Sequence, residues 1–351
     1  MGFEDNIRKI DPYIPGEQPK KKVIKLNTNE CPYPPSPEVI RALREADWER
    51  LRLYPEPACD TLVDALADHY GLRREQVFAG VGSDDVLSMC FLTFFAGDRP
   101  ILFPEITYSF YDVWAKVYGI PFETIELNED LTLDPSGFKK PNGGVVIANP
   151  NAPTGVAESR EVIEGIIEYN KDSVVIVDEA YIDFGGESVL PLIDRYPNLI
   201  VTRTMSKSRA LAGMRIGYCF GDERLIKYMN DVKYSVNSYT MNMPALIAGA
   251  AAIRDTEYFR QTIEKIKKTR EWTKERLREM GFTFNDSRTN FIFAKVPEGC
   301  NAKEIFEGLR SMGIYVRYFD KPKINDRMRI SVGTDDEMNF LMGALKKLTR
   351  T

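Results

Sequence analysis

Three short apolar runs constrain the fold of this 351-residue chain more than any other feature. They are Val145–Ala148, Val174–Val177 and Leu199–Val201. Strands that are apolar on both faces are typical of parallel sheets covered by helices on each side. Their spacing of roughly 25 to 30 residues leaves room for a crossover helix between successive strands. The pattern predicts an α/β fold with a mostly parallel sheet flanked by helices.

Each of these runs is followed at once by polar, proline or glycine residues. The endings are 149–151, 178–181 and 202–207. Ligands of open parallel sheets bind at the carboxyl ends of the strands. We therefore expect the three endings to converge on one site.

The chain divides by composition into three parts. Residues 11–37 hold seven of the 21 prolines, which favours an extended N-terminal arm over residues 1–37, suited to lie across a neighbour. The large α/β domain is expected over residues 38–255. A long amphipathic helix then opens a smaller α/β domain over residues 256–351. Within it we expect strands at 290–293, 314–316 and 328–332, and helices at 302–312 and 335–348.

Charge and apolar content exclude several classes of protein. The formal net charge is −5 with acids and bases interleaved, which argues against a nucleic-acid surface. The longest apolar stretch, 245–253, is too short to span a bilayer, and the acidic N-terminus has no signal-peptide pattern. Five dispersed cysteines match neither a disulfide framework nor a zinc site. A cytoplasmic protein with reduced thiols is expected.

Lys207 lies in a run that combines a lysine with hydroxyls and an arginine. Thr204 and Ser206 precede it, and Arg215 follows eight residues later. A lysine amine condenses with a carbonyl to form a Schiff base, while hydroxyls and an arginine bind phosphate. An aldehyde that carries a phosphate is pyridoxal 5'-phosphate, so this run predicts that cofactor.

Asp178 and Tyr181 follow the middle apolar run. A buried carboxylate needs a partner, and a pyridinium nitrogen supplies one and keeps the ring electron-withdrawing. A strand-end aspartate that only caps a helix is the alternative for Asp178 alone. Tyr181, three residues later, is placed to reach the phenolate oxygen of the same ring, which favours the cofactor interpretation.

A second phosphate-binding element is expected at Gly80–Asp84, between a short strand at 76–79 and an apolar helix. Helix N-terminal N–H groups bind phosphate, although such glycine turns often serve packing alone. After another short strand, 101–103, Tyr108 is suited to stack on the cofactor ring. His69 is the single histidine and has no visible partner, so a histidine triad and a metal site are not expected. Proton transfer then falls to Lys207.

The motifs at 149–155, 177–181 and 204–207, with Arg215, resemble the fold-type I pyridoxal-phosphate aminotransferases. Within that family, the segments at 11–16, 26–30, 53–55 and 328–333 are most similar to the histidinol-phosphate aminotransferases. The resemblance covers essentially the whole chain in order. It implies transamination between histidinol phosphate and 2-oxoglutarate, with L-glutamate as the other amino compound, in histidine biosynthesis.

The resemblance also implies a role for each matching residue. Lys207 is the Schiff-base lysine, Asp178 the ring-nitrogen partner and Tyr181 the phenolate-oxygen donor. Tyr54 reaches the phosphate of a neighbouring subunit, which implies a homodimer. Further cofactor contacts are expected from Gly82, Ser83, Asp84, Tyr108, Asn151, Thr204, Ser206 and Arg215, and substrate contacts from Tyr13, Asn29, Arg317 and Arg329.

Three positions depart from the family pattern. Ala152 stands where an asparagine commonly bonds the phenolate oxygen, so Asn151 or Asn149 is expected to take over. Cys31 and Phe340 replace an asparagine and an arginine that relatives often have. The last two differences weaken the exact substrate assignment. Three alternatives stay open: an aromatic amino acid aminotransferase, a lyase resembling threonine-phosphate decarboxylase, and a non-catalytic protein that uses Gly80–Asp84 as a nucleotide-binding turn.

Overall fold

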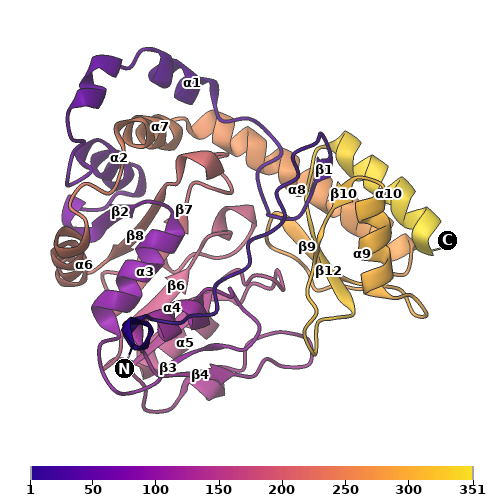
Figure 1. Ribbon diagram of the computed structural model, residues 1–351, viewed down its shortest axis with the longest axis horizontal. Coiled ribbons are helices and arrows are strands. Elements are labelled where there is room, and N and C mark those ends of the chain that lie inside the picture. The colour runs from indigo at the N-terminus through magenta and orange to yellow at the C-terminus, as the bar shows by residue number, and fades with distance from the viewer. Residues whose placement is uncertain (1, 350–351) are drawn as a thin grey trace.

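The computed structural model describes residues 2–349, and within them a seven-stranded sheet forms the centre of the larger part of the molecule (Figure 1). Its strand order is β2-β8-β7-β6-β5-β3-β4. β8 runs antiparallel to both neighbours, and the other pairings are parallel. The strands are β2 (Val77–Gly80), β3 (Ile101–Pro104), β4 (Phe122–Ile125), β5 (Gly144–Ala148), β6 (Val175–Asp178), β7 (Leu199–Thr204) and β8 (Gly217–Gly221).

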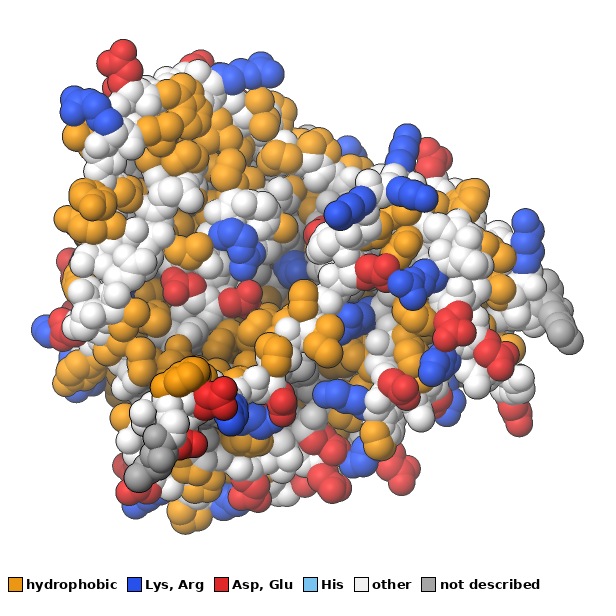
Figure 2. Space-filling model, viewed as in Figure 1, with side chains coloured by type: hydrophobic (Ala, Val, Ile, Leu, Met, Phe, Trp, Pro, Cys, Tyr) orange, Lys and Arg blue, Asp and Glu red, His pale blue; other side chains and the backbone are white. Residues whose placement is uncertain are grey.

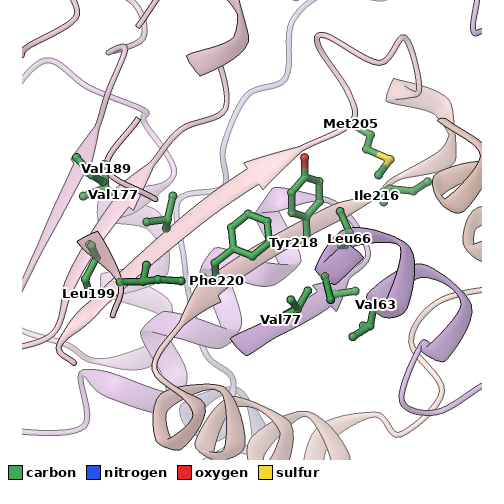
Figure 3. Close-up of a cluster of buried hydrophobic side chains, with 14 of the residues drawn as sticks. Val63, Leu66, Val77, Val177, Val189, Leu199, Met205, Ile216, Tyr218 and Phe220 are labelled. Atoms are coloured by element: carbon green, nitrogen blue, oxygen red, sulfur yellow. The ribbon is translucent and has the colours of Figure 1, made fainter. Parts of the chain in front are cut away.

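Helices cover both faces of this sheet, because alternate side chains of each buried strand point to opposite faces. Val145 and Ile147 of β5 pack with one set of helices, whereas Val146 packs with the other. Figure 3 shows part of the first core, where Val63 and Leu66 lie against Val77 and strand β8. The first set contains α2 (Asp60–Tyr70), α5 (Arg160–Tyr169) and α7 (Met243–Arg254), and the second contains α3 (Ser83–Phe94), α4 (Tyr111–Tyr118) and α6 (Glu223–Val236).

A separate hydrophobic core lies in the C-terminal part of the chain. The long helix α8 (Thr256–Glu279) leads to an antiparallel sheet of β11 (Arg317–Tyr318), β12 (Arg327–Ser331) and β9 (Phe291–Lys295). Two further helices complete it, α9 (Ala302–Ser311) and α10 (Asp335–Thr349). Residue 255, where the domain boundary was expected, lies between α7 and α8.

The N-terminal segment contributes to both parts. Ile24–Lys25 forms β1, which pairs in parallel with β10 (Ile314–Tyr315). Leu26 is buried in the C-terminal core, so the residues next to this strand are not a free arm. Earlier in the segment, Tyr13 stacks on Phe110 of its own chain at a centroid distance of 4.2 Å. α1 (Pro37–Arg44) then begins after Ser36, whose hydroxyl accepts from the Val39 amide.

The carboxyl ends of the parallel strands meet at one edge of the large sheet, as predicted. Gly80, Ala148 and Asp178 end strands β2, β5 and β6, and Thr204 ends β7. β8 runs the other way, so its first residue, Gly217, lies at the same edge opposite Thr204. No helix among residues 2–349 has the length and apolar character to span a membrane.

Candidate active site

A cavity of about 290 Å³ lies over this edge of the sheet. A larger groove of about 630 Å³ adjoins it, and the two share Tyr108 and Ala152. Figure 2 shows the molecule hollowed between its two parts, with charged side chains around the hollow. The cavity is lined by nine of the predicted site residues, together with Ala152, namely Ser83, Asp84, Tyr108, Asp178, Tyr181, Thr204, Ser206, Lys207 and Arg215.

Lys207 reaches into the cavity from the turn after β7. Its Nζ donates to the Thr28 carbonyl oxygen at 3.1 Å and lies 5.8 Å from the centre of the Tyr181 ring. Glu30 also lines the cavity, where it is paired with Lys25. The amine therefore lies beside the segment 26–30, with one neutral acceptor to release when it reacts.

Asp178 is 5% exposed and has no cationic partner among the described residues. Its Oδ1 accepts from the Ala180 amide at 3.1 Å and from the Thr202 hydroxyl at 3.3 Å. Its Oδ2 accepts from the Tyr111 hydroxyl at 3.0 Å. Burial raises the pKa of Asp178 to about 6, against the lowering effect of these three donors. An acid held in this way favours a cationic ring nitrogen as its missing partner.

Tyr181 is oriented by Asn29. The Asn29 side-chain amide donates to the Tyr181 hydroxyl at 2.9 Å, which leaves the tyrosine proton free to donate elsewhere. Asn29 is itself fixed by Ser331, whose hydroxyl donates to Asn29 Oδ1 at 3.0 Å. Asn29 was predicted as a substrate contact, but it is buried and absent from the lining of either cavity, so its direct effect is on Tyr181.

The other end of the cavity brings together the residues that were predicted to bind a phosphate. Gly82, with φ +87°, precedes Ser83, the first residue of α3. Ser83 and Asp84 line the cavity, so the N-terminus of α3 faces it. A Cβ on Gly82 would lie 2.6 Å from Nη2 of Arg215. Ser206 accepts weakly from Arg215 Nη1 at 3.5 Å, and its amide donates to the Thr204 hydroxyl. These donors surround a space that a side chain would fill.

Asp84 lies beside Ser83, Thr204, Ser206 and Arg215, the group of residues that we call the phosphate seat. Its carboxylate accepts from Arg215 Nη2 at 3.2 Å and from the Tyr108 hydroxyl at 2.7 Å. Burial, with Asp84 beside it, raises the pKa of Tyr108 well above its usual value, so its hydroxyl stays a donor. Asp85, in contrast, accepts from the Val81 amide and closes the turn. A bound phosphate would compete with Asp84 for Arg215.

The adjoining groove contains two arginines from the C-terminal part. Arg317 and Arg329 lie directly opposite each other on β11 and β12 and both line the groove, together with Tyr13. The Arg329 guanidinium carbon lies 5.4 Å from the centre of the Phe291 ring and 5.7 Å from that of Phe319, and its Nε has no partner among the described residues. Burial lowers the pKa of Arg329, and the charge of Arg317 acts in the same direction. Like charges placed opposite are unfavourable, which an anion between them would relieve.

Two predicted cofactor contacts are not brought to the cavity of this chain. The amide of Asn151 donates to the Ile106 carbonyl and to Thr154, and its Oδ1 accepts from Thr107. All its polar atoms are thus used in holding the loop, and Asn149 is similarly bonded to the Glu158 backbone. The prediction that either replaces the usual asparagine is not supported. Tyr54 is 82% exposed and stacks on Tyr239, away from this cavity.

Tyr111, the donor to Asp178, was not predicted from the sequence. Its position three residues after Tyr108, at the first residue of α4, does not indicate that its hydroxyl reaches Asp178. Of the positions that depart from the family pattern, Ala152 lines both cavities, Cys31 packs near Tyr181 and Phe340 is exposed on α10.

Comparison with known proteins agrees with this geometry. Residues 21–345 match the family Aminotransferase class I and II, and the chain belongs to that family. The fold and the site thus define a pyridoxal-phosphate-dependent aminotransferase, as the sequence predicted.

Individual proteins that are similar to this chain have more specific names than the family. The chain is 48% identical to histidinol-phosphate aminotransferase of Chromohalobacter salexigens, with 98% of each chain covered. It is 49% identical to the enzyme of that name from Clostridium botulinum, over 99% of this chain and 98% of the relative. The crystal structure of histidinol-phosphate aminotransferase from Sinorhizobium meliloti in complex with pyridoxal-5'-phosphate superposes with a TM-score of 0.85 at 26% identity, covering 94% and 92% of the two chains.

Proposed function

We propose that this protein transfers the amino group of histidinol phosphate to 2-oxoglutarate, which becomes L-glutamate, and that it uses pyridoxal 5'-phosphate. The observation that carries the proposal is the pairing of a lysine cavity with an adjoining two-arginine groove. The names and near-complete coverage of the relatives support the same substrates.

The residues of the cavity fit this cofactor. Lys207 would hold its aldehyde carbon, Asp178 its ring nitrogen and Tyr181 its phenolate oxygen. Arg215, Thr204, Ser206 and the α3 N-terminus would bind its phosphate. When bound, the cofactor supplies an electron sink for the carbon that carries the substrate's amino group. Tyr108, at the edge of both cavities, would cover one face of the ring.

Lys207 also moves the proton in this proposal. With the substrate amine in its place, its Nζ would be a free base beside the carbon that carries the substrate's amino group, and it would take up and return the proton of that carbon. Asn29 holds the Tyr181 hydroxyl in place during this transfer. The Thr28 carbonyl oxygen accepts a hydrogen bond from this amine at 3.1 Å and would orient the amine while it acts as a base.

Arg329 would bind the anionic group of both substrates. Histidinol phosphate has no carboxylate, so its phosphate ester must occupy the place that glutamate's carboxylate takes in the other half-reaction. A guanidinium fork fits either group. Arg317 directly opposite would share the larger phosphate charge, and Tyr13 would close that side of the groove.

We also propose that the active unit is a homodimer. Residues Trp48, Leu51, Leu53 and Tyr54 expose 45%, 59%, 51% and 82% of their surface on one short segment. Figure 2 shows hydrophobic side chains gathered on the end of the molecule formed by α1 and its neighbours. Exposed aromatic and aliphatic side chains grouped in this way mark an interface. Tyr54 in such a dimer would complete the partner's phosphate seat.

A survey of half-reactions tests the substrate assignment. Purified enzyme loaded with cofactor is mixed with one amino compound at a time, and the visible absorbance of the bound cofactor is followed. We expect it to be lost with L-glutamate and with histidinol phosphate. Faster loss with tyrosine or phenylalanine than with histidinol phosphate would reassign the substrate, and release of carbon dioxide would replace transamination by decarboxylation. The Arg329→Lys variant should lose activity with both anionic substrates while retaining cofactor.

A further inference from the structure

Tyr111 is a fully buried side chain with a polar end directed at the site. It is the first residue of α4, and its ring packs edge-on or tilted against Phe103, Tyr108 and Trp114. Its hydroxyl donates to Asp178 Oδ2 at 3.0 Å. Because the ring is enclosed on all sides, the hydroxyl cannot leave this carboxylate without disturbing the core.

The three donors to Asp178 are divided unequally between its oxygens. Oδ1 accepts from the Ala180 amide, two residues after β6 ends at Asp178, and from the Thr202 hydroxyl on the neighbouring strand β7. Oδ2 accepts from Tyr111 alone. A carboxylate oxygen has two acceptor positions, so Oδ2 retains one for an incoming donor. Tyr111 thus fixes the plane of the carboxylate and determines which oxygen remains available.

We propose that Tyr111 is a positioning residue that keeps Asp178 ionised and directs its Oδ2 towards the ring nitrogen of the cofactor. The proposal deepens the function proposed above and rests on Asp178 being the partner of that nitrogen. Tyr111 itself touches neither cofactor nor substrate, because it is absent from the lining of both cavities.

The charges around Asp178 explain why a buried donor is needed. Asp84 of α3 acts to raise its pKa, in the same direction as burial. Lys207, Arg215, Tyr108 and Tyr181 also face the cavity, but hydrogen bonds engage Lys207 with Thr28, and Arg215 with Asp84. The hydrogen bond from Tyr111 lowers the pKa of Asp178 and so opposes the effect of burial. Burial, together with the neighbouring Asp178, raises the pKa of Tyr111 itself well above its usual value. Its hydroxyl therefore remains a donor throughout the neutral range.

The test replaces one oxygen atom in the full-length chain. Tyr111→Phe keeps the packed ring and removes only the donor to Asp178. Tyr118→Phe is the matched control, because Tyr118 is on the same helix and its hydroxyl bonds to Ser88, away from Asp178. The first measurement is the pKa of the Asp178 carboxyl in cofactor-free protein, by NMR of chain labelled at the aspartate carboxyl carbons, with Asp178→Asn identifying the signal.

We expect Tyr111→Phe to raise the pKa of Asp178 by roughly one pH unit, since a hydrogen bond to a charged group favours the charged form. Tyr118→Phe should leave it unchanged. In the holoenzyme, the dissociation constant of pyridoxal phosphate at pH 7 should rise several-fold in Tyr111→Phe and stay constant in the control. The pH below which cofactor binding weakens should move upward by a similar interval.

The outcomes separate this inference from the proposed function. If wild-type protein binds pyridoxal phosphate and transaminates, while Tyr111→Phe matches it in both the Asp178 pKa and the cofactor affinity, the inference is wrong and the function stands. Wild-type protein that fails to bind the cofactor would overturn both. A changed pKa with a matching loss of affinity supports both.

Discussion

Gly82 shows how a single missing side chain shapes the phosphate seat. Its φ of +87° is strained for other residues, and an added Cβ would lie 2.6 Å from Arg215 Nη2. We expect Gly82→Ala to weaken binding of pyridoxal phosphate by about tenfold or more, because a displaced charge-assisted bond of this kind contributes about 1.5–3 kcal/mol. The dissociation constant measured by cofactor absorbance checks this.

The matched control separates backbone strain from the steric effect at Arg215. Gly71, at the end of α2, also has a positive φ of +66°, but nothing lies within 4 Å of a Cβ built on it. Gly71→Ala should therefore lose only about 1 kcal/mol of stability, with unchanged cofactor affinity. Equal losses of affinity in the two variants would show that Arg215 is not held by this turn.

Asp178 is predicted to lower the stability of the cofactor-free protein above neutral pH. Its pKa is about 6 in the folded chain against 3.8 for an ordinary aspartate, so the folded state binds the proton more tightly. The stabilisation is complete below about pH 4 and is lost as the pH rises through 6, on the order of 3 kcal/mol in total. Asn cannot ionise, so cofactor-free Asp178→Asn should melt at a higher temperature than wild type at pH 8. Melting curves at pH 4 and pH 8 check this, and the difference should vanish at pH 4.

Residue chemistry predicted only part of the site. Lys207, Asp178 and Arg215 could be assigned because a lysine, a strand-end carboxylate and an arginine each have a specific use for one cofactor. The role of Asn151 could not be assigned, because a side-chain amide can bond to the protein's own loop as well as to a ligand. Here its hydrogen bonds connect it to Thr107 and Thr154. The role of Tyr111 could not be assigned either, because a tyrosine within an aromatic core gives no sequence signal of where its hydroxyl points.

At the scale of elements, a buried ion pair joins the ends of β6 and β7. Arg203 donates to Glu179 at 2.7 Å, and their side chains are 8% and 1% exposed. Glu179 also accepts from the Val189 amide and the Ser188 hydroxyl. The pair lies next to Asp178 and Thr204 in sequence, so it fixes the strand ends that carry the site.

Glu179→Gln should destabilise the protein by about 3 kcal/mol, because it leaves the Arg203 charge buried without a counterion. Urea unfolding of wild type and variant at pH 7 measures this as a lower midpoint. As a control, Asp231→Asn removes the exposed pair between Lys227 and Asp231 on α6 and should leave the midpoint unchanged. A midpoint for Glu179→Gln equal to that of the control would mean that water reaches Arg203.

The elements themselves were predicted where burial was complete. β5, most of β6 and the first half of β7 are apolar on both faces, and the structure confirms the three strands to within three residues at each end. β4 and β8 were missed. β4 is an edge strand whose central residues Glu123 and Thr124 are exposed, and β8 begins and ends with glycine, so neither shows the uninterrupted apolar pattern. The predicted strand at 314–316 corresponds to β10, which ends one residue earlier, at Tyr315, and pairs with the N-terminal segment. The next strand, β11, pairs with β12 instead and was not predicted.

At the scale of the whole molecule, the cavity of one chain has no contribution from the exposed segment at Trp48–Tyr54. That segment belongs to the same chain but leaves its aromatic side chains largely in solvent, with Tyr54 stacked on Tyr239. A second copy would cover these side chains and bring Tyr54 to a phosphate seat that its own chain cannot reach. The arrangement predicts active sites assembled from two subunits.

Mixing two inactive variants tests this directly. Lys207→Ala lacks the reactive amine but keeps Tyr54, whereas Tyr54→Ala keeps the amine and leaves its partner's phosphate seat incomplete. In a mixed dimer, one site combines Lys207 of one chain with Tyr54 of the other. Random exchange makes half of the dimers mixed, with one intact site in each, so equal amounts should recover about a quarter of wild-type activity. Each variant alone, at the same total concentration, provides the baseline. Activity that stays at the average of the two variants after proven subunit exchange would place Tyr54 outside the partner's site.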